Sequence, residues 1–175
     1  DSPRIVGNAI FYFNPVDEQA KKILLKQIPS GLYVIGLLSG KAIHGFAASW
    51  LSQVSFKPPV IMVAVREDSG KLSMIKKGGV LAVSYLGKNS KETVQKFFRK
   101  VSIHGETLDE VPHFPGKVTG TPVLNDAIGY LECKVIKIAE GFGDHAAIFA
   151  EVIAAKLVKD EPPLLMSDTS WSYGG

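Results

Sequence analysis

AASWLSQVSFKPP, residues 47–59, is the segment that decides the fold, because it lies between two apolar stretches and carries three serines, a tryptophan and a closing pair of prolines. Small side chains allow a flat ligand to lie against the backbone, and hydroxyl and free N–H groups can hydrogen-bond a ring edge or a phosphate. Serine and proline are also common in ordinary polar turns. The residues alone leave a ligand-binding crossing and an ordinary loop equally open.

The stretches on either side of this segment predict β-strands joined mostly by tight turns. The predicted strands cover residues 33–38, 42–50, 60–66, 80–86, 127–140 and 145–158. A Ser-Gly-Lys turn joins the first pair and a Gly-Phe-Gly-Asp loop joins the last pair, which is the pattern of β-hairpins. Strands and helices do not alternate regularly, so the pattern favours a mainly β (α+β) fold with an antiparallel barrel over a doubly wound sheet.

Three helices and one long loop complete the prediction. Asn14 is expected to cap the first helix, with Pro15 in its first position and apolar residues along one face. The apolar positions of that face are Ala20, Ile23, Leu24 and Ile28. Two short helices are predicted over residues 71–77 and 91–99. Periodicity fails over residues 100–122, and a loop of this length in a compact domain is usually functional or mobile.

Length, charge and cysteine content limit the classes of protein to which the chain can belong. The chain has 175 residues, which suits a single domain over residues 1–175, and its formal net charge of +3 includes no long Lys/Arg block that would indicate nucleic acid. Cys133 is the only cysteine, so an internal disulfide and a multi-thiolate metal site are excluded, and its strand-like setting favours a buried structural thiol. No apolar run is long enough to span a membrane and the polar start is unlike a signal peptide, so we expect no membrane partner and a cytoplasmic location.

Motifs for several common enzyme chemistries are absent from the sequence. It contains no phosphate-binding P-loop, no complete dinucleotide fingerprint and no serine-hydrolase elbow. The four histidines are scattered and lack carboxylates at ligand spacing, so no metal site is predicted. They are His44, His104, His113 and His145. His145 follows Asp144 at the mouth of a predicted hairpin, where it is either a catalytic candidate facing a cleft or a strand-end residue paired with Asp144.

Four motifs, in order along the chain, resemble those of the flavin reductase-like family, the FMN-binding split barrels. They are GxAASWxxxxSxxPP at residues 45–59, the GVLAVSYL strand at residues 79–86, GTPVL with a later Ala and Leu-Glu-Cys at residues 120–133, and Gly-Asp-His with a later Glu-Val at residues 143–152. Each motif is weak alone, but four in the family's order cover nearly the whole chain from the first helix onward. Within the family, the residues of the first motif are most similar to the flavin reductase module at the C-terminal end of cyanobacterial flavodiiron proteins.

The resemblance implies a split barrel that forms a homodimer and binds FMN, or FAD, near the dimer interface. The residues that it assigns to cofactor binding are Ala47, Ala48, Ser49, Trp50, Ser52, Ser55, Lys71, Ser84 and Tyr85. Ala48, Ser49 and Trp50 would meet the isoalloxazine edge largely through the backbone. The two serines after Trp50 would lie towards the ribityl chain and phosphate, with Lys71 as a further phosphate contact. His145 would stand near the reactive face of the flavin or near the nicotinamide, as the catalytic residue.

The sequence departs from the family pattern at two of these positions. Lys71 stands where the family often has Thr, and Ser84 stands where it has Asn. A lysine can still pair with phosphate, as a point charge without the hydroxyl. These departures leave the flavin expectation in place and put only the individual contacts in question.

The activity that the resemblance implies is that of an oxidoreductase. NADH or NADPH would reduce the flavin, and the reduced flavin would pass electrons to a partner protein, free flavin or dioxygen. Hydride transfer is carried by the cofactors, so no paired carboxylates are required. Two alternatives stay open: a flavin-carrying electron-transfer protein that does not react with nicotinamide, and a non-flavin binder on the same barrel, for example for haem.

Overall fold

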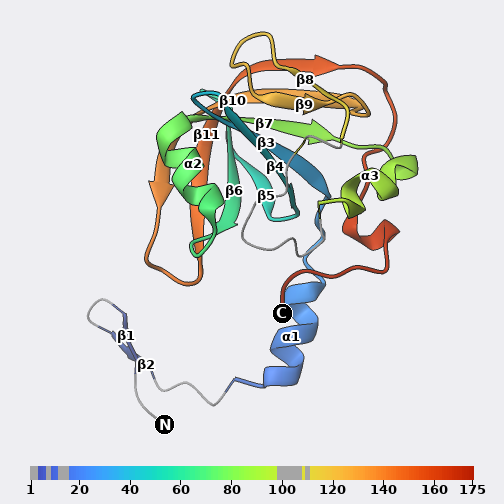
Figure 1. Ribbon diagram of the computed structural model, residues 1–175. Helices are drawn as coiled ribbons and strands as arrows, with labels where there is room; N and C mark the ends of the chain where they lie inside the picture. The colour runs from blue at the N-terminus through green and yellow to red at the C-terminus, as the bar shows by residue number, and fades with distance from the viewer. Residues whose placement is uncertain (1–3, 7–8, 12–15, 98–107, 109–110) are drawn as a thin grey trace. The chain divides into compact units, whose positions relative to one another are not determined.

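The computed structural model describes residues 4–6, 9–11, 16–97, 108 and 111–175, and the chain divides by its contacts into two units (Figure 1). One unit comprises Asp1–Pro29 together with Trp171–Gly175, and the other comprises Ser30–Ser170. None of the helices in the described part of the chain is both long and apolar enough to cross a bilayer.

The first unit contains a short hairpin and one helix. Strands β1 (Arg4–Val6) and β2 (Ala9–Phe11) pair antiparallel, and helix α1 spans Glu18–Lys26. The predicted helix start at Asn14 is wrong, because Asp17 is extended and its carboxylate accepts a hydrogen bond from Ala20 N at 2.9 Å, which makes Asp17 the N-cap. Residues 14 and 15 themselves lie outside the described residues.

The second unit is built on a seven-stranded sheet in which all neighbouring strands are antiparallel. Its strands are β3 (Tyr33–Ser39), β4 (Ala42–Ala48), β5 (Leu51–Ser55), β6 (Val60–Arg66), β7 (Val80–Tyr85), β10 (Gly129–Ala139) and β11 (His145–Leu157). Their order in the sheet is β4-β3-β7-β10-β11-β6-β5. The mainly β, antiparallel prediction is therefore confirmed, and the six predicted strands all correspond to observed ones.

The two strands at opposite ends of this order, β4 and β5, are consecutive in the chain and are separated only by Ser49 and Trp50. Because a two-residue connection cannot cross the width of seven strands, the sheet must curl until its two ends meet. The ends share no strand ladder, so the barrel is split along this line. The prediction that β4 continues to Trp50 and that a loop follows is wrong: the chain turns at Ser49, and residues 51–55 form an edge strand paired with β6.

The core fills the inside of the barrel with aliphatic side chains from nearly every strand. Its members include Ile35, Leu37, Phe46, Val63, Leu81, Val83, Cys133 and Ile148. Cys133 is buried, as predicted, and burial raises the pKa of its thiol to about 12. Helix α2 (Gly70–Gly78) closes the barrel by inserting Leu72 and Ile75.

The predicted helix over residues 91–99 is shorter than expected. A 3₁₀ turn, η1 (Lys88–Ser90), leads into α3 (Lys91–Gln95), and Phe97 beyond it is buried. Another 3₁₀ turn, η3, covers Met166–Asp168 near the end of the chain. Phe97 and the helix therefore anchor the chain just before the residues that the structure does not describe.

The long loop predicted over residues 100–122 contains regular structure in its described part. Strands β8 (His113–Pro115) and β9 (Pro122–Leu124) pair antiparallel and lie beside β7 and β10 (Figure 1). Three-residue strands give no period that a sequence pattern can show, which is why they were missed. The hairpin approaches the barrel closely, since a Cβ at Gly36 would lie 2.0 Å from the carbonyl oxygen of Pro122.

The Glu132 carboxylate is hydrogen-bonded to the turn between β8 and β9. Its side chain is 1% exposed, although strand alternation predicts it on the polar face of β10. Its carboxylate accepts hydrogen bonds from Val118 N at 3.1 Å, from Thr119 N at 2.8 Å and from Thr119 Oγ1 at 2.8 Å. A buried carboxylate is tolerated only when it is satisfied in this way.

Candidate functional site

The connection between β4 and β5 places a buried serine and a half-exposed tryptophan where the split barrel closes. Ser49 is 6% exposed and its carbonyl accepts a hydrogen bond from Leu51 N at 3.1 Å, which makes the turn tight. The Trp50 carbonyl accepts from Ala64 N at 3.0 Å, so this residue is already tied to β6. Trp50 is 38% exposed, so part of the residue can be reached from solvent.

His145 lies directly against Trp50. It begins β11, pairs with Arg66 at the end of β6, and is only 8% exposed. The Trp50 and His145 rings have centroids 4.7 Å apart and planes inclined at 42°. The structure thus brings together two residues that the sequence singled out separately, one from each side of the barrel closure.

Asp144 sets the protonation form of His145. His145 Nδ1 lies 2.6 Å from Asp144 Oδ1, and the pairing expected of a strand-end histidine is therefore present. The hydrogen bond from His145, followed by the charge of its ring, lowers the pKa of the Asp144 carboxyl below its usual value. An ionised carboxylate can only accept, so Nδ1 must carry the proton.

Two polar turns meet beside this histidine. Glu67 N donates to the Asp144 carbonyl at 3.0 Å, and Gly141 N donates to Glu67 Oε1 at 2.9 Å. On either side of Glu67, the Arg66 guanidinium donates twice to Asp68, at 3.0 and 2.8 Å, and this pair lowers the pKa of the Asp68 carboxyl. The turn after β6 therefore holds the hairpin tip from which β11 starts.

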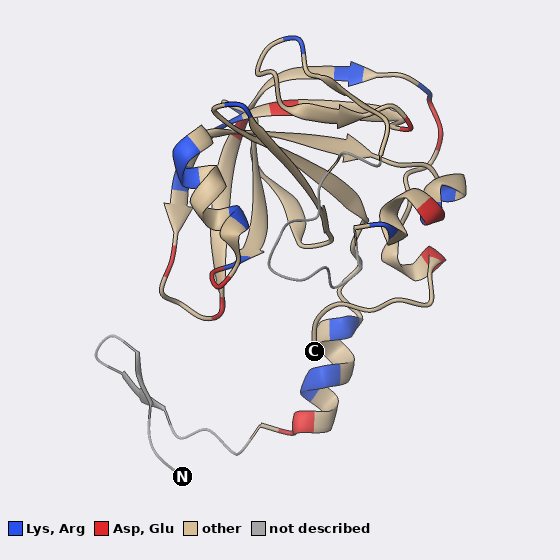
Figure 2. Cartoon of the chain, in the orientation of Figure 1, with Lys and Arg blue, Asp and Glu red and all other residues tan. Residues whose placement is uncertain are grey.

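The start of α2 has the character of an anion site. Ser69 is the N-cap, but its hydroxyl donates to the Arg66 carbonyl at 2.7 Å and does not cap the helix, and no acidic residue occupies the first turn. Lys71 is half-buried in that first turn, with Nζ 4.9 Å from the centroid of the Phe46 ring. Helix α2 contains lysines and no acidic residue (Figure 2). A phosphate group fits such a helix end.

His44 lies in the barrel near this helix start. Burial, followed by the charge of Lys71, lowers the pKa of His44, as a half-buried structural histidine would show. Within the described part of the chain its Nε2 atom is buried without a hydrogen-bond partner. His113 is also half-buried, with Nδ1 2.8 Å from the Val111 carbonyl, whereas His104 lies outside the described residues. Across the described residues, no three His, Cys, Asp or Glu side chains gather into a group that could hold a metal ion.

The two serines of β5 lie on the exposed edge of the sheet. Ser52 Oγ donates to the Gln53 carbonyl at 3.2 Å, and the Ser55 carbonyl accepts from Gln53 Nε2 at 3.1 Å. Both serines are on the strand that follows Trp50 and are reachable from solvent. Ala47 is half-buried, and Ala48, which ends β4, is buried.

Tyr85 and Ser84 point to opposite faces of β7. Ser84 is 1% exposed, and its hydroxyl accepts a hydrogen bond from Leu124 N at 3.1 Å, beneath β9. Tyr85 packs edge-on against Tyr33 with ring centroids 5.0 Å apart, and burial raises its pKa to about 12, so the phenol is protonated at neutral pH. Ala48, Tyr33 and Tyr85 are successive partners across the sheet, so Tyr85 lies two strands from the Ser49–Trp50 turn.

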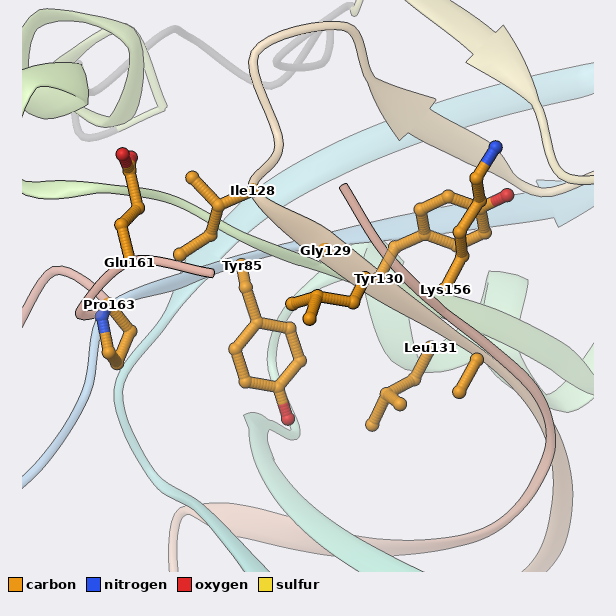
Figure 3. A pocket seen from close by; sticks show the side chains of 10 residues that line it. Tyr85, Ile128, Gly129, Tyr130, Leu131, Lys156, Glu161 and Pro163 are labelled. Atoms are coloured by element: carbon orange, nitrogen blue, oxygen red, sulfur yellow. The ribbon is translucent and has the colours of Figure 1, made fainter. Parts of the chain in front are cut away.

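An open cavity of about 380 Å³ adjoins Tyr85 (Figure 3). The same row of partners continues from Tyr85 to Gly129 and Leu157, and all three residues line the cavity. The wall is almost entirely apolar, and Lys156 and Glu161 also line it. The predicted cofactor residues thus fall into two groups, one on β4, β5, the turn between them and the start of α2, and one on β7. Within the second group only Tyr85 lines the cavity, because Ser84 points to the other face of the strand.

Comparison with known proteins identifies the class to which the fold and site belong. A sequence model of the family described as "flavin reductase like domain" matches residues 25–174. The chain therefore belongs to the flavin reductase-like family, whose solved neighbours share this split barrel.

Relatives of two kinds match the chain. A putative diflavin flavoprotein A 3 of Nostoc sp. strain PCC 7120 is 30% identical over 137 residues, which are 78% of this chain and 24% of that protein. The NADH-dependent FAD reductase of Streptomyces globisporus is 27% identical over 143 residues, 81% of this chain and 78% of that one. The chain spans about a quarter of the length of the diflavin flavoproteins that it matches.

The similarity extends to the three-dimensional fold of a solved structure. The NADH:FAD oxidoreductase SgcE6 of Streptomyces globisporus C-1027 superposes with a TM-score of 0.75 at 25% identity, covering 89% of this chain and 92% of that one. The same oxidoreductase has also been solved in complex with NAD and FAD fragments.

Proposed function

We propose that this chain is an NAD(P)H-dependent flavin reductase. The observation that carries the proposal is the closure of the barrel, where Trp50 contacts the buried His145 in a chain of the flavin reductase-like family. The relatives support nicotinamide as the donor, since they include an NADH-dependent FAD reductase and an NADH:FAD oxidoreductase. When bound, the flavin supplies the hydride chemistry, and the chain must hold and orient it.

The proposed flavin contacts keep the assignments that the family resemblance gives to these residues. Backbone groups of Ala47, Ala48, Ser49 and Trp50 would contact the isoalloxazine edge. Ser52 and Ser55 would face the ribityl chain and phosphate from the exposed edge strand. Lys71, at a helix start without a carboxylate, would pair with the phosphate. A phosphate group therefore fits the donor set that this turn provides, and FMN, or FAD, is the proposed cofactor.

The second group of predicted residues lies farther from the closure. Tyr85 would offer a protonated phenol at the edge of the apolar cavity. The Ser84 hydroxyl already accepts from Leu124 N, so its contribution to the cofactor would be to fix the strand that carries Tyr85.

His145 is the proposed catalytic residue. Its Nδ1 proton is held by Asp144, and Trp50 packs against its ring, so the imidazole has a defined orientation before any ligand binds. Such an orientation would align the nicotinamide with the flavin, and alignment is the main contribution that a protein makes to hydride transfer.

Anaerobic mixing of the flavin-loaded protein with NADH, and separately with NADPH, tests the proposal. We expect the visible flavin band to bleach with at least one of the two nucleotides. A band that persists with both would rule out the activity, and mass analysis of the released cofactor distinguishes FMN from FAD.

A second candidate is a flavin module that takes electrons from another part of a larger protein or from a protein partner. The observation that favours it is the match to only a quarter of each diflavin flavoprotein. Reduction by a reduced electron-transfer protein, in the absence of any bleaching by nicotinamide, would distinguish this function from the first.

Assembly and location are further parts of the proposal. A homodimer is supported by the apolar side chains that β11 exposes near its end, with Ile153 42% and Leu157 68% exposed. The electron acceptor would be a partner protein or free flavin.

A cytoplasmic location is consistent with the single, buried thiol of the chain. A single functional domain is consistent with the family match over residues 25–174.

A further inference from the structure

We propose that Glu67 is a positioning residue for His145, acting through the hairpin tip that carries Asp144. This inference rests on the proposed function, because it assigns His145 a role in the nicotinamide reaction. Glu67 does not contact the imidazole in any described hydrogen bond, and its influence runs through the backbone.

The first step is the attachment of one turn to the other. Glu67 uses two groups: its N–H donates to the Asp144 carbonyl at 3.0 Å, and its Oε1 accepts from Gly141 N at 2.9 Å. These bonds hold Gly141 and Asp144, two of the five tip residues (140–144) between β10 and β11. Hairpin tips with a glycine-rich sequence are otherwise adaptable, so the bonds restrict the segment directly before His145.

The second step leads from the tip to the imidazole. With its carbonyl fixed by Glu67 N, Asp144 can present Oδ1 at 2.6 Å from His145 Nδ1. The carboxylate itself is 79% exposed and would sample several rotamers on a free tip. The Glu67 bonds thereby favour the rotamer that keeps the proton on Nδ1.

The third step distinguishes Glu67 from an ordinary surface carboxylate. Glu140, in the same hairpin, forms an ion pair with Lys76 of α2 at 2.8 Å and has no described bond to residues 141–145. Glu67 is half-buried and bonds to the tip itself. Two glutamates at one hairpin thus provide a matched pair of which only one should affect His145.

The experiment compares Glu67→Ala, Glu67→Gln and Glu140→Gln in the full-length, flavin-loaded chain. Steady-state rates with the effective nicotinamide give kcat and KM, and flavin affinity is measured separately. Glu67→Ala removes only the side-chain bond to Gly141 N and leaves the backbone bond to the Asp144 carbonyl in place. We therefore expect it to lower kcat/KM about fivefold, the equivalent of one hydrogen bond, while flavin affinity stays within about twofold. Glu67→Gln keeps an oxygen acceptor for Gly141 N and should stay near wild type, as should Glu140→Gln.

A second readout reports on the imidazole without any turnover. In ¹⁵N-labelled protein, at a pH where the ring is neutral, wild-type His145 should show a proton bound to Nδ1. This signal should weaken or exchange faster in Glu67→Ala and persist in the other two variants. A structural role alone would not change the protonation site while the melting temperature stays constant.

The outcomes separate the inference from the proposed function. If nicotinamide fails to bleach the wild-type flavin, the proposed function fails and the Nδ1 signal alone decides whether Glu67 positions His145. If the wild type is active but Glu67→Ala matches it in rate and in the Nδ1 signal, the inference is wrong. Equal losses in Glu67→Ala and Glu140→Gln would also overturn it.

Discussion

Two glutamates accept hydrogen bonds from backbone N–H groups of a turn, but one is fully buried and the other is partly exposed to solvent. Glu132 is buried and accepts from two backbone N–H groups and one hydroxyl beneath the β8–β9 hairpin. Glu67 is half-buried and accepts from Gly141 N at the tip beside His145. Without Glu132, polar groups would lie unsatisfied away from water, whereas water can replace Glu67. The first region serves stability, and the second holds a partly solvated tip in place beside His145.

The largest effect is expected in the buried region. Glu132→Ala removes the acceptor for Val118 N, Thr119 N and Thr119 Oγ1, and we expect it to lower the free energy of unfolding by about 3 kcal/mol in urea denaturation. Glu132→Gln, which keeps one acceptor oxygen, should lose less. A loss for the alanine variant below about 1 kcal/mol would show that the turn does not depend on this carboxylate.

The next largest effect is expected at the candidate flavin site, where a substitution should change flavin affinity more than fold stability. Lys71→Gln removes the cation at the start of α2 and should weaken flavin binding about tenfold, measured as flavin fluorescence on release. The difference should shrink as salt is added, because an exposed phosphate contact is screened. Lys77→Gln, in the last turn of the same helix, is the control. Equal affinities for the two variants would place the phosphate elsewhere.

Ser84 could serve either fold stability or cofactor binding, and a substitution distinguishes the two roles. The family resemblance assigns it to the cofactor, yet its hydroxyl accepts from Leu124 N beneath β9. We expect Ser84→Ala to lower the free energy of unfolding by about 1 kcal/mol, the value of one lost hydrogen bond, with flavin affinity unchanged. Weaker flavin binding at unchanged stability would instead place the hydroxyl in the cofactor site.

The smallest effect is the acid dependence of stability at Asp144. Its pKa is lower in the folded chain than in the unfolded one, so its contribution is present above the unfolded value, near pH 4, and is lost as pH falls through the folded value. The melting temperature of Asp144→Asn should therefore fall less than that of wild type between about pH 5 and pH 3. The two curves should coincide at the acid end, and parallel curves would contradict the assignment.

The barrel itself could be predicted from the sequence because its strands carry strong local signals. Apolar runs such as residues 60–65 and 80–83 and the glycine-containing turns of the hairpins sufficed. Strand β5 was missed because three of its five residues, Ser52, Gln53 and Val54, are exposed and alternate no apolar face towards the core. Its pairing with β6 is fixed by tertiary contacts, which no local pattern records.

The site was predictable in part. Motif resemblance selected Trp50 and His145, but their contact depends on the curl of the whole sheet, which a linear pattern does not contain. Glu67 gave no signal, since a glutamate at a strand end usually faces water. The burial of Glu132 was equally hidden, because strand alternation predicts it on the polar face and only the β8–β9 hairpin covers it.

The two-residue span of Ser49 and Trp50 also has a consequence for how a cofactor would be received. The same peptide groups that join the edge strands of the sheet are those proposed to contact the isoalloxazine, so folding fixes their spacing in advance. Little chain entropy would then remain to be lost when the ring arrives. Binding at such a preformed turn selects a ligand by shape, and a ring whose edge does not match this spacing would have to distort the two edge strands to bind.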